Sequence, residues 1–266
     1  MASHGEPHNR KDALDPISQS EWEKDPFNLN SCLKLQDIRL EGVGSRARVF
    51  SVTHHHHDSP GDVLKNAKPR VCLKIITASF GDTAEHNLEV LRKNVLGVIK
   101  VWRNLEHPNI NPIYGWTLDP TSNDSHFCFV SQFCPNYNVS RYLRKHPDAD
   151  REKIVCEVAK GLRYLHDEAN IVHGDVKPNN VLISDEGIAM LSDFGQAEIL
   201  DRAPQNLQDA GRFLTIEYWP PEVFSTEDAD YPLQRSKSGD VWAFGCTLLE
   251  VSYPEFFLQK MANPVL

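Results

Sequence analysis

The stretch VHGDVKPNNVLI, residues 172–183, decides the fold of this 266-residue chain. It places an acid at Asp175, a lysine two residues later at Lys177 and an amide five residues after the acid at Asn180, between short apolar runs. A phosphoryl transfer requires these groups: a base that orients a hydroxyl, a positive charge on the moving phosphoryl group and an oxygen ligand for Mg²⁺. The stretch therefore predicts a compact loop that carries phosphoryl-transfer chemistry.

A second acid lies eighteen residues after Asp175, in the sequence Asp193-Phe194-Gly195. It follows the apolar run 188–191, and a carboxylate at the end of such a run is well suited to hold a hard cation. The two segments together indicate a site for a phosphate group and a divalent metal.

The order and spacing of five motifs resemble those of a eukaryotic protein kinase domain. The motifs are VCLK (71–74), HGDVKPNN (173–180), SDFG (192–195), TIEYWPPE (215–222) and GDVWAFG (239–245). The resemblance runs from about residue 35 to the chain end. Lys177 and Thr215 are typical of the serine/threonine type, and we identify a member of the tyrosine-kinase-like group that is truncated at its C-terminus.

The resemblance implies a role for each matching residue. Asp175 would be the catalytic base and Lys177 the cation that contacts the phosphate, whereas Asn180 and Asp193 would hold Mg²⁺. The other assignments are Lys74 on the α- and β-phosphates of ATP, Asp240 as the buried anchor of the catalytic loop, and residues 193–222 as the activation segment.

A small-residue turn matches the glycine loop of kinases. Gly42-x-Gly44-x-x-Ala47-x-Val49 has alanine in the third glycine place, which predicts a slightly stiffer phosphate lid, with Val49 above the adenine. Ser131 would gate the back of the adenine pocket, and its small side chain predicts an open pocket. The residues expected to bind the nucleotide are Gly42, Gly44, Val49, Lys74, Ser131, Phe133 and Cys134.

Two departures from the kinase pattern bear on activity. Gly174 replaces the arginine of many kinases, so we expect activity that does not depend on phosphorylation of the activation segment. Val98, nine residues before His107, stands where kinases place the helix glutamate that pairs with the strand lysine. Glu89, fifteen residues after Lys74, is a rival partner on another face of the same helix.

We therefore expect an α+β, two-lobed kinase-like fold. Residues 1–30 are predicted to be a flexible leader, 31–133 a small antiparallel-sheet lobe with one helix, and 134–266 a mainly helical large lobe that lacks its last helices. The predicted strands fall within 33–53, 70–77, 110–116 and 127–133, and the predicted helices cover 88–105, 151–167 and 239–252. The apolar run 239–252 predicts a helix that is buried on all sides.

The amino-acid composition restricts the classes of partner that the protein is expected to bind. The chain has 28 basic and 37 acidic residues and a net charge of −9, which argues against nucleic acid or an anionic membrane as a partner of the whole surface. No apolar run approaches the roughly 18 residues of a membrane span, so we expect no membrane insertion and a cytoplasmic protein. The six scattered cysteines predict free thiols. The run His54–His57 predicts an exposed loop. Oligomeric state stays open.

The reaction expected from these residues is transfer of the γ-phosphate of ATP to Ser or Thr hydroxyls of protein substrates, with Mg²⁺. One alternative is a catalytically weak pseudokinase that binds nucleotide and acts as a scaffold, because Val98 replaces the helix glutamate. Another is a small-molecule phosphotransferase of the aminoglycoside-kinase type, which shares the pattern H-G-D-x-x-x-x-N. Lys177 and the motifs at 215–222 and 239–245 resemble protein kinases instead.

Overall fold

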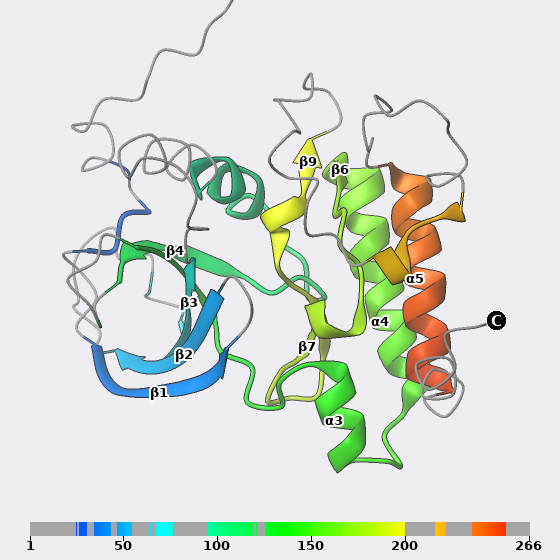
Figure 1. Cartoon of the computed structure of the whole chain (residues 1–266), viewed down its shortest axis with the longest axis horizontal. Helices are drawn as coiled ribbons and strands as arrows, with labels where there is room; N and C mark the ends of the chain where they lie inside the picture. Colours follow the sequence, from blue (N-terminus) through cyan, green and yellow to red (C-terminus); the bar gives the residue numbers. More distant parts are fainter. Residues whose placement is uncertain are drawn as a thin grey trace, which may run out of the picture.

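The computed structural model describes residues 25, 27–30, 35–43, 47–54, 64, 67–76, 95–119, 121, 126–199, 216–221 and 236–253. They form a sheet-containing lobe beside a mainly helical lobe, as expected (Figure 1). The described helices include none with the length and apolar character of a membrane span.

The small lobe is a five-stranded antiparallel sheet with the strand order β1-β2-β3-β5-β4. The strands are β1 (Leu35–Val43), β2 (Ala47–His54), β3 (Arg70–Ile76), β4 (Ile113–Leu118) and β5 (Phe127–Gln132). Along β3, Val71, Leu73 and Ile75 are fully buried, so Lys74 lies on the opposite face of the sheet. The strand predicted over 110–116 begins later, because Ile110 pairs instead with β8 of the large lobe.

One helix accompanies the sheet. It is described over 95–102, and the part of the predicted helix before residue 95, which includes Glu89, lies outside the described residues. Val95, Ile99 and Trp102 are buried at steps of four and three residues, which is the spacing of one helix face. The prediction of an amphipathic helix in this lobe is therefore confirmed over the described residues 95–102.

The last residues of the predicted leader, 1–30, lie against β4. The Leu29 N–H donates to the carbonyl of Trp116 at 2.8 Å, and the Trp116 N–H donates to the carbonyl of Phe27 at 2.9 Å. Leu29 is 1% exposed, so this described part of the predicted leader packs against the sheet. Gly115 makes this contact possible, because a Cβ on it would lie 2.3 Å from the Phe27 carbonyl oxygen.

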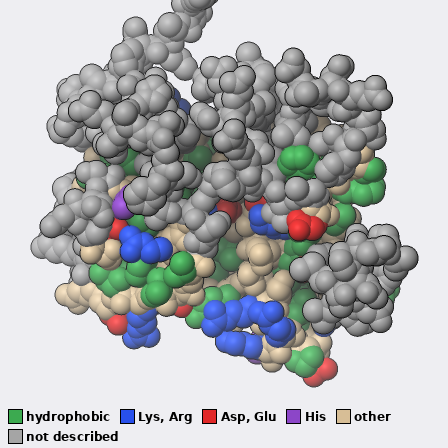
Figure 2. All heavy atoms as spheres, in the orientation of Figure 1, with side chains coloured by type: hydrophobic (Ala, Val, Ile, Leu, Met, Phe, Trp, Pro, Cys, Tyr) green, Lys and Arg blue, Asp and Glu red, His purple; other side chains and the backbone are tan. Residues whose placement is uncertain are grey.

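The large lobe holds three α-helices among its described residues. They are α3 (Val139–Lys145), α4 (Arg151–Arg163), which continues into the π-helical turn η1 (Tyr164–Glu168), and α5 (Lys237–Ser252). The side chains of Asn138, Asp150 and Ser236 accept the N–H of the residue three positions on, and these bonds define where the helices begin. Lys and Arg side chains gather over α3 on the face shown in Figure 2.

Short strands and single helical turns form the segments between these helices. The strand β6 (Ile171–Val172) pairs with β9 (Glu198–Ile199), and β7 (Val181–Ile183) pairs with β8 (Ala189–Leu191). The single 3-10 turns are η2 (Pro178–Asn180), η3 (Phe194–Gln196) and η4 (Ile216–Tyr218). These elements place residues 173–180 and 192–195 in neighbouring loops.

The prediction that the helix over 239–252 is buried on all sides is wrong. The residues of α5 that are buried are Asp240, Ala243, Thr247 and Val251. They repeat every three or four residues and form one face, which packs against α4 and α3. Val241 and Trp242 are 57% and 45% exposed, so both lie outside this buried face.

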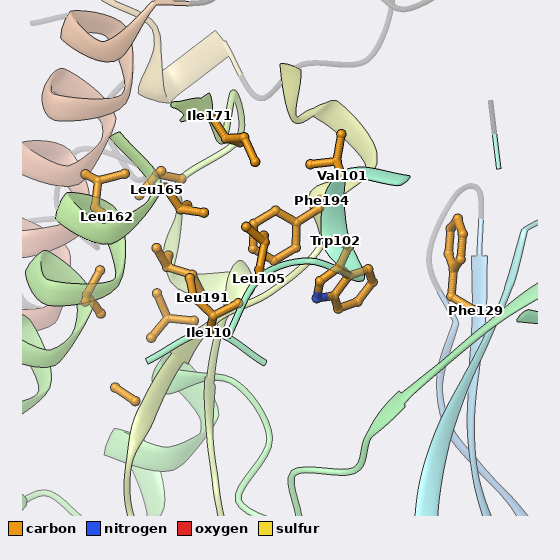
Figure 3. Packing of buried hydrophobic residues seen from close by; sticks show 14 of the residues in the cluster. Val101, Trp102, Leu105, Ile110, Phe129, Leu162, Leu165, Ile171, Leu191 and Phe194 are labelled. Carbon is orange, nitrogen blue, oxygen red and sulfur yellow. The ribbon is translucent and has the colours of Figure 1, made fainter. Parts of the chain in front are cut away.

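A single large apolar cluster spans both lobes. Figure 3 shows Trp102 and Phe129 from the sheet lobe on one side of Phe194, with Leu162 and Leu165 of the helical lobe on the other. Phe194 is fully buried in this cluster. The motif that supplies Asp193 therefore lies where the cores of the two lobes meet.

Candidate active site

The loop 173–177 is held by a buried histidine. The Nε2 of His173 lies 3.1 Å from the Ser192 carbonyl oxygen, and its Nδ1 lies 3.3 Å from the backbone nitrogen of Asp175. A carbonyl only accepts and a backbone N–H only donates, so Nε2 carries the ring proton. The ring centroid also lies 5.0 Å from that of Phe194. His173 thus ties the loop of Asp175 to the segment of Asp193.

Asp240, in the first turn of α5, holds the same loop from the other side. Its Oδ2 accepts the His173 backbone N–H at 2.7 Å and lies 2.8 Å from His166 Nε2, and its Oδ1 accepts the Gly174 N–H at 2.8 Å. Gly174 has a φ of 76°, the left-handed region that favours glycine. Asp240 lies where the kinase resemblance places the buried anchor.

The carboxylate of Asp175 is held by two neighbours in its own loop. Lys177 Nζ donates to both of its oxygens, at 2.9 Å to Oδ1 and 2.7 Å to Oδ2. Asn180 Nδ2 donates to Oδ2 at 2.9 Å and to the Asp175 backbone carbonyl at 2.8 Å. Because Asn180 uses its nitrogen for both bonds, its amide oxygen is the atom left for a cation. The predicted acid, lysine and amide are therefore in direct contact.

Asp193 pairs with the strand lysine. Lys74 Nζ lies 2.6 Å from Asp193 Oδ2, so β3 and the segment after β8 are joined across the two lobes. Ser192 reaches the catalytic loop as well, because both its N–H and its hydroxyl donate to the Asn180 carbonyl, at 2.9 and 3.0 Å. These bonds bring residues 74, 175, 177, 180 and 193 into one constellation.

The charges in this constellation keep Asp193 ionised. Burial alone would raise the pKa of Asp193, but the ammonium groups of Lys74 and Lys177 lower it below its ordinary value. Asp193 also adopts the left-handed region, with a φ of 65°, which aspartate tolerates better than most residues. The site therefore offers a carboxylate in its charged, metal-binding form.

The available donors fit magnesium. The Asp193 carboxylate and the Asn180 amide oxygen are hard oxygen ligands, and Mg²⁺ usually takes one or two carboxylates together with substrate phosphates. The described residues contain no cluster of three or more His, Cys, Asp or Glu side chains that could hold a metal ion by themselves. The donor set suits a metal that arrives with a nucleotide.

The strand register aligns the predicted nucleotide-binding residues. Gly42 pairs with Val49, Val49 with Lys74, and Lys74 with Phe129, so one row of residues crosses the sheet at the lysine. Cross-strand neighbours share a face, so Val49 lies on the same face as Lys74. Gly44 lies outside the described residues.

The back of the predicted pocket is lined by small groups. Ser131 is 5% exposed and pairs with Cys72, two residues before Lys74. Burial raises the pKa of the Cys72 thiol to about 11 and that of Cys134 to about 12, so both stay protonated and unreactive at neutral pH. Phe133, one of the residues expected to bind the nucleotide, is half-buried, with the guanidinium carbon of Arg70 5.9 Å from its ring centroid.

Val98 is half-buried and packs against the large apolar cluster. A valine offers no carboxylate, and the partner of Lys74 among the described residues is Asp193. The rival partner Glu89 and the activation-segment residue Thr215 lie outside the described residues. The described helix thus contributes packing, rather than charge, to the site.

Two residues outside the predicted motifs support the site. Trp102 donates from Nε1 to the Asn111 carbonyl at 2.6 Å, and its ring centroid lies 5.2 Å from that of Phe194. His166, in the π-helical turn, reaches Asp240. The only sequence signal for Trp102 is its place on the apolar face of the helix, and none marks His166, because its contact joins residues 74 positions apart.

The structure has two lobes, a lysine on a strand, a loop whose acid is bonded by a lysine and an amide, and a buried acid on a helix that anchors this loop. Together these features define a kinase-type architecture. The chain belongs to the protein kinase domain family, whose model matches residues 38–264. It is similar to the L-type lectin-domain containing receptor kinase IV.1 of Arabidopsis thaliana, with 30% identity over 87% of this chain and 32% of the relative.

Two further relatives are serine/threonine kinases by name. The probable serine/threonine-protein kinase MRK1 homolog of Encephalitozoon cuniculi (strain GB-M1) is 27% identical over 90% of this chain and 68% of its own. The serine/threonine-protein kinase tousled-like 1-B of Danio rerio is 30% identical over 64% of this chain and 23% of its own. The chain is thus homologous to serine/threonine kinases. It spans between about a quarter and a third of the length of its lectin receptor kinase relatives.

Proposed function

We propose that this chain is an active protein kinase that transfers the γ-phosphate of ATP to serine or threonine hydroxyls of proteins. The observation that supports this most is the constellation of five side chains in two bonded groups: Lys74 pairs with Asp193, and Lys177 and Asn180 both bond Asp175. Ser192, next to Asp193, links the two groups through its bonds to the Asn180 carbonyl. Each of the five side chains is of the type that phosphoryl transfer uses, and the family match makes a protein the expected substrate.

In this proposal Asp175 accepts the proton of the substrate hydroxyl. Its Oδ2 already accepts from Lys177 and Asn180, whereas from the described residues Oδ1 accepts only the Lys177 bond, so Oδ1 has the freer lone pair for the hydroxyl. Lys177 balances the negative charge between the base and the phosphoryl group. Asn180 and Asp193 would hold Mg²⁺, which when bound neutralises phosphate charge, and Lys74 would bind the α- and β-phosphates.

A second candidate function is nucleotide binding without efficient transfer. It is favoured by Val98, because no carboxylate from the described helix holds Lys74 in place. A displacement of about 1 Å at a reacting group can cost on the order of a hundredfold in rate. Such a chain would bind ATP and act as a scaffold.

The replacement Asp175→Ala separates these functions. Removal of a general base costs about a hundredfold to ten-thousandfold in rate, so transfer to a protein substrate should fall by that factor while ATP affinity changes less than about twofold. Asp148→Ala, at an exposed carboxylate, is the matched control. Equal loss of binding and transfer would contradict the role of Asp175. Nucleotide binding by the unmodified chain with no transfer would favour the scaffold.

A further inference from the structure

A hydrogen bond joins the two lobes at the predicted phosphate lid. The hydroxyl of Tyr137 donates to Glu41 Oε2 at 2.8 Å, between residues 96 positions apart. Glu41 lies on β1 directly before Gly42, and Tyr137 lies in the loop between β5 and α3. Neither residue belongs to the catalytic constellation.

The sheet lobe fixes Glu41. Ser51 of β2, which is fully buried, bonds Glu41 Oε1, and Arg70 of β3 donates to the same Ser51 oxygen at 3.0 Å from Nε and 2.8 Å from Nη2. Arginine has no acceptor, so Ser51 must accept both of these bonds. Its single proton is therefore directed to Glu41, and three strands together orient one carboxylate.

The helical lobe fixes Tyr137. Its φ of 59° lies in the left-handed region, where non-glycine residues are rare. Its backbone is bonded on both sides, to the Cys134 carbonyl at 3.0 Å and from the Ile183 N–H at 2.8 Å. The guanidinium carbon of Arg141, on the basic helix α3, lies 3.5 Å from the ring centroid, which is a close cation–π contact.

The charge states strengthen the bond between these two residues. Burial would raise the pKa of Glu41, but the hydrogen bonds from Ser51 and Tyr137 lower it below its ordinary value. The bond to Glu41 in turn raises the pKa of Tyr137. At neutral pH the carboxylate is thus charged and the phenol protonated, which gives a charge-assisted hydrogen bond.

We propose that Tyr137 and Glu41 form a latch that fixes the end of β1, next to Gly42, to the large lobe, and that they act as positioning residues for the nucleotide. The role in nucleotide binding rests on the proposed function. Both ends of the latch are held by their own lobe, so the bond limits the movement of the lobes relative to each other. A nucleotide entering or leaving beneath the lid would have to wait for this bond to open.

Hydrogen exchange of the whole chain without nucleotide tests the latch itself. In Tyr137→Phe the backbone amides of residues 41–43 and 47–49 should exchange about three to ten times faster than in the unmodified chain, as expected for the loss of one hydrogen bond. Tyr142→Phe is the matched control, because Tyr142 is on α3 and no hydrogen bond of its hydroxyl to a described residue is present. Equal exchange in all three proteins would overturn the proposal.

Dissociation of a fluorescent ATP analogue with Mg²⁺ tests the positioning role. Tyr137→Phe and Glu41→Ala should each raise the dissociation rate about three- to tenfold, and the double variant no further, because both remove the same bond. Glu41→Gln keeps an acceptor and should lie closer to the unmodified chain. Additive effects, or unchanged dissociation, would refute the role. If the unmodified chain binds no nucleotide, the proposed function fails, while hydrogen exchange still decides the latch.

Discussion

Replacing Asp240 by asparagine removes one of the two oxygens that hold the catalytic loop. The buried carboxylate, 2% exposed, accepts from His173 and His166 at Oδ2 and from Gly174 at Oδ1. Asparagine can keep its oxygen at the Oδ2 position, but its NH₂ group then faces the Gly174 N–H, so two donors meet without an acceptor. One charge-assisted bond is lost and two are weakened. We expect this to lower the free energy of unfolding by about 2–4 kcal/mol.

Urea unfolding followed by far-UV circular dichroism measures this loss. Asp148→Asn, at an exposed carboxylate, should stay within about 0.5 kcal/mol of the unmodified chain. Asp240→Ala, which loses all three bonds, should be less stable than Asp240→Asn. The reasoning is refuted if Asp240→Asn unfolds at the same free energy as the control, because the three short bonds would then contribute nothing net to folding.

Substitutions at two further positions test the packing around the site and the contact of the N-terminal segment. Trp102→Ala should cost about 3–5 kcal/mol of unfolding free energy. Trp102→Phe loses the bond to the Asn111 carbonyl and part of the buried ring but keeps an aromatic side chain, so it should cost less, about 1–3 kcal/mol; the reverse order in urea unfolding would contradict the packing described. Gly115→Ala should displace Phe27 and cost about 1–3 kcal/mol. Limited proteolysis should then cut near Phe27 faster than in Gly97→Ala, whose added methyl meets no neighbour, and equal cleavage would count against the contact.

The features that the sequence predicted best are those that depend on residues close together along the chain. Asp175, Lys177 and Asn180 fall within six residues, and a loop of that length brings them together whatever surrounds it. The strands were also predictable, because alternation of burial along β3 follows directly from the alternation of its residue types. Asp240 was found only through the kinase resemblance, since nothing in its own neighbourhood marks it as an anchor.

Contacts between distant segments were not predictable. An apolar pattern says that a helix has apolar faces, but it does not say how many are covered, and Trp242 of α5 is accordingly 45% exposed. Leu29 is an isolated leucine among polar residues, so no period marks its burial beside Gly115. The bond between Tyr137 and Glu41 joins a loop of the large lobe to strand β1, and their proximity depends on both lobes at once.

The affinity for ATP with and without Mg²⁺, measured for the unmodified chain and for Asp193→Asn, tests most directly whether the constellation is one nucleotide and metal site. We expect Mg²⁺ to tighten ATP binding to the unmodified chain by about tenfold or more, a factor worth about 1.4 kcal/mol. Asp193→Asn should lose most of that gain, and Asp148→Asn should keep it. An equal effect of Mg²⁺ in Asp193→Asn and in the unmodified chain would contradict the site.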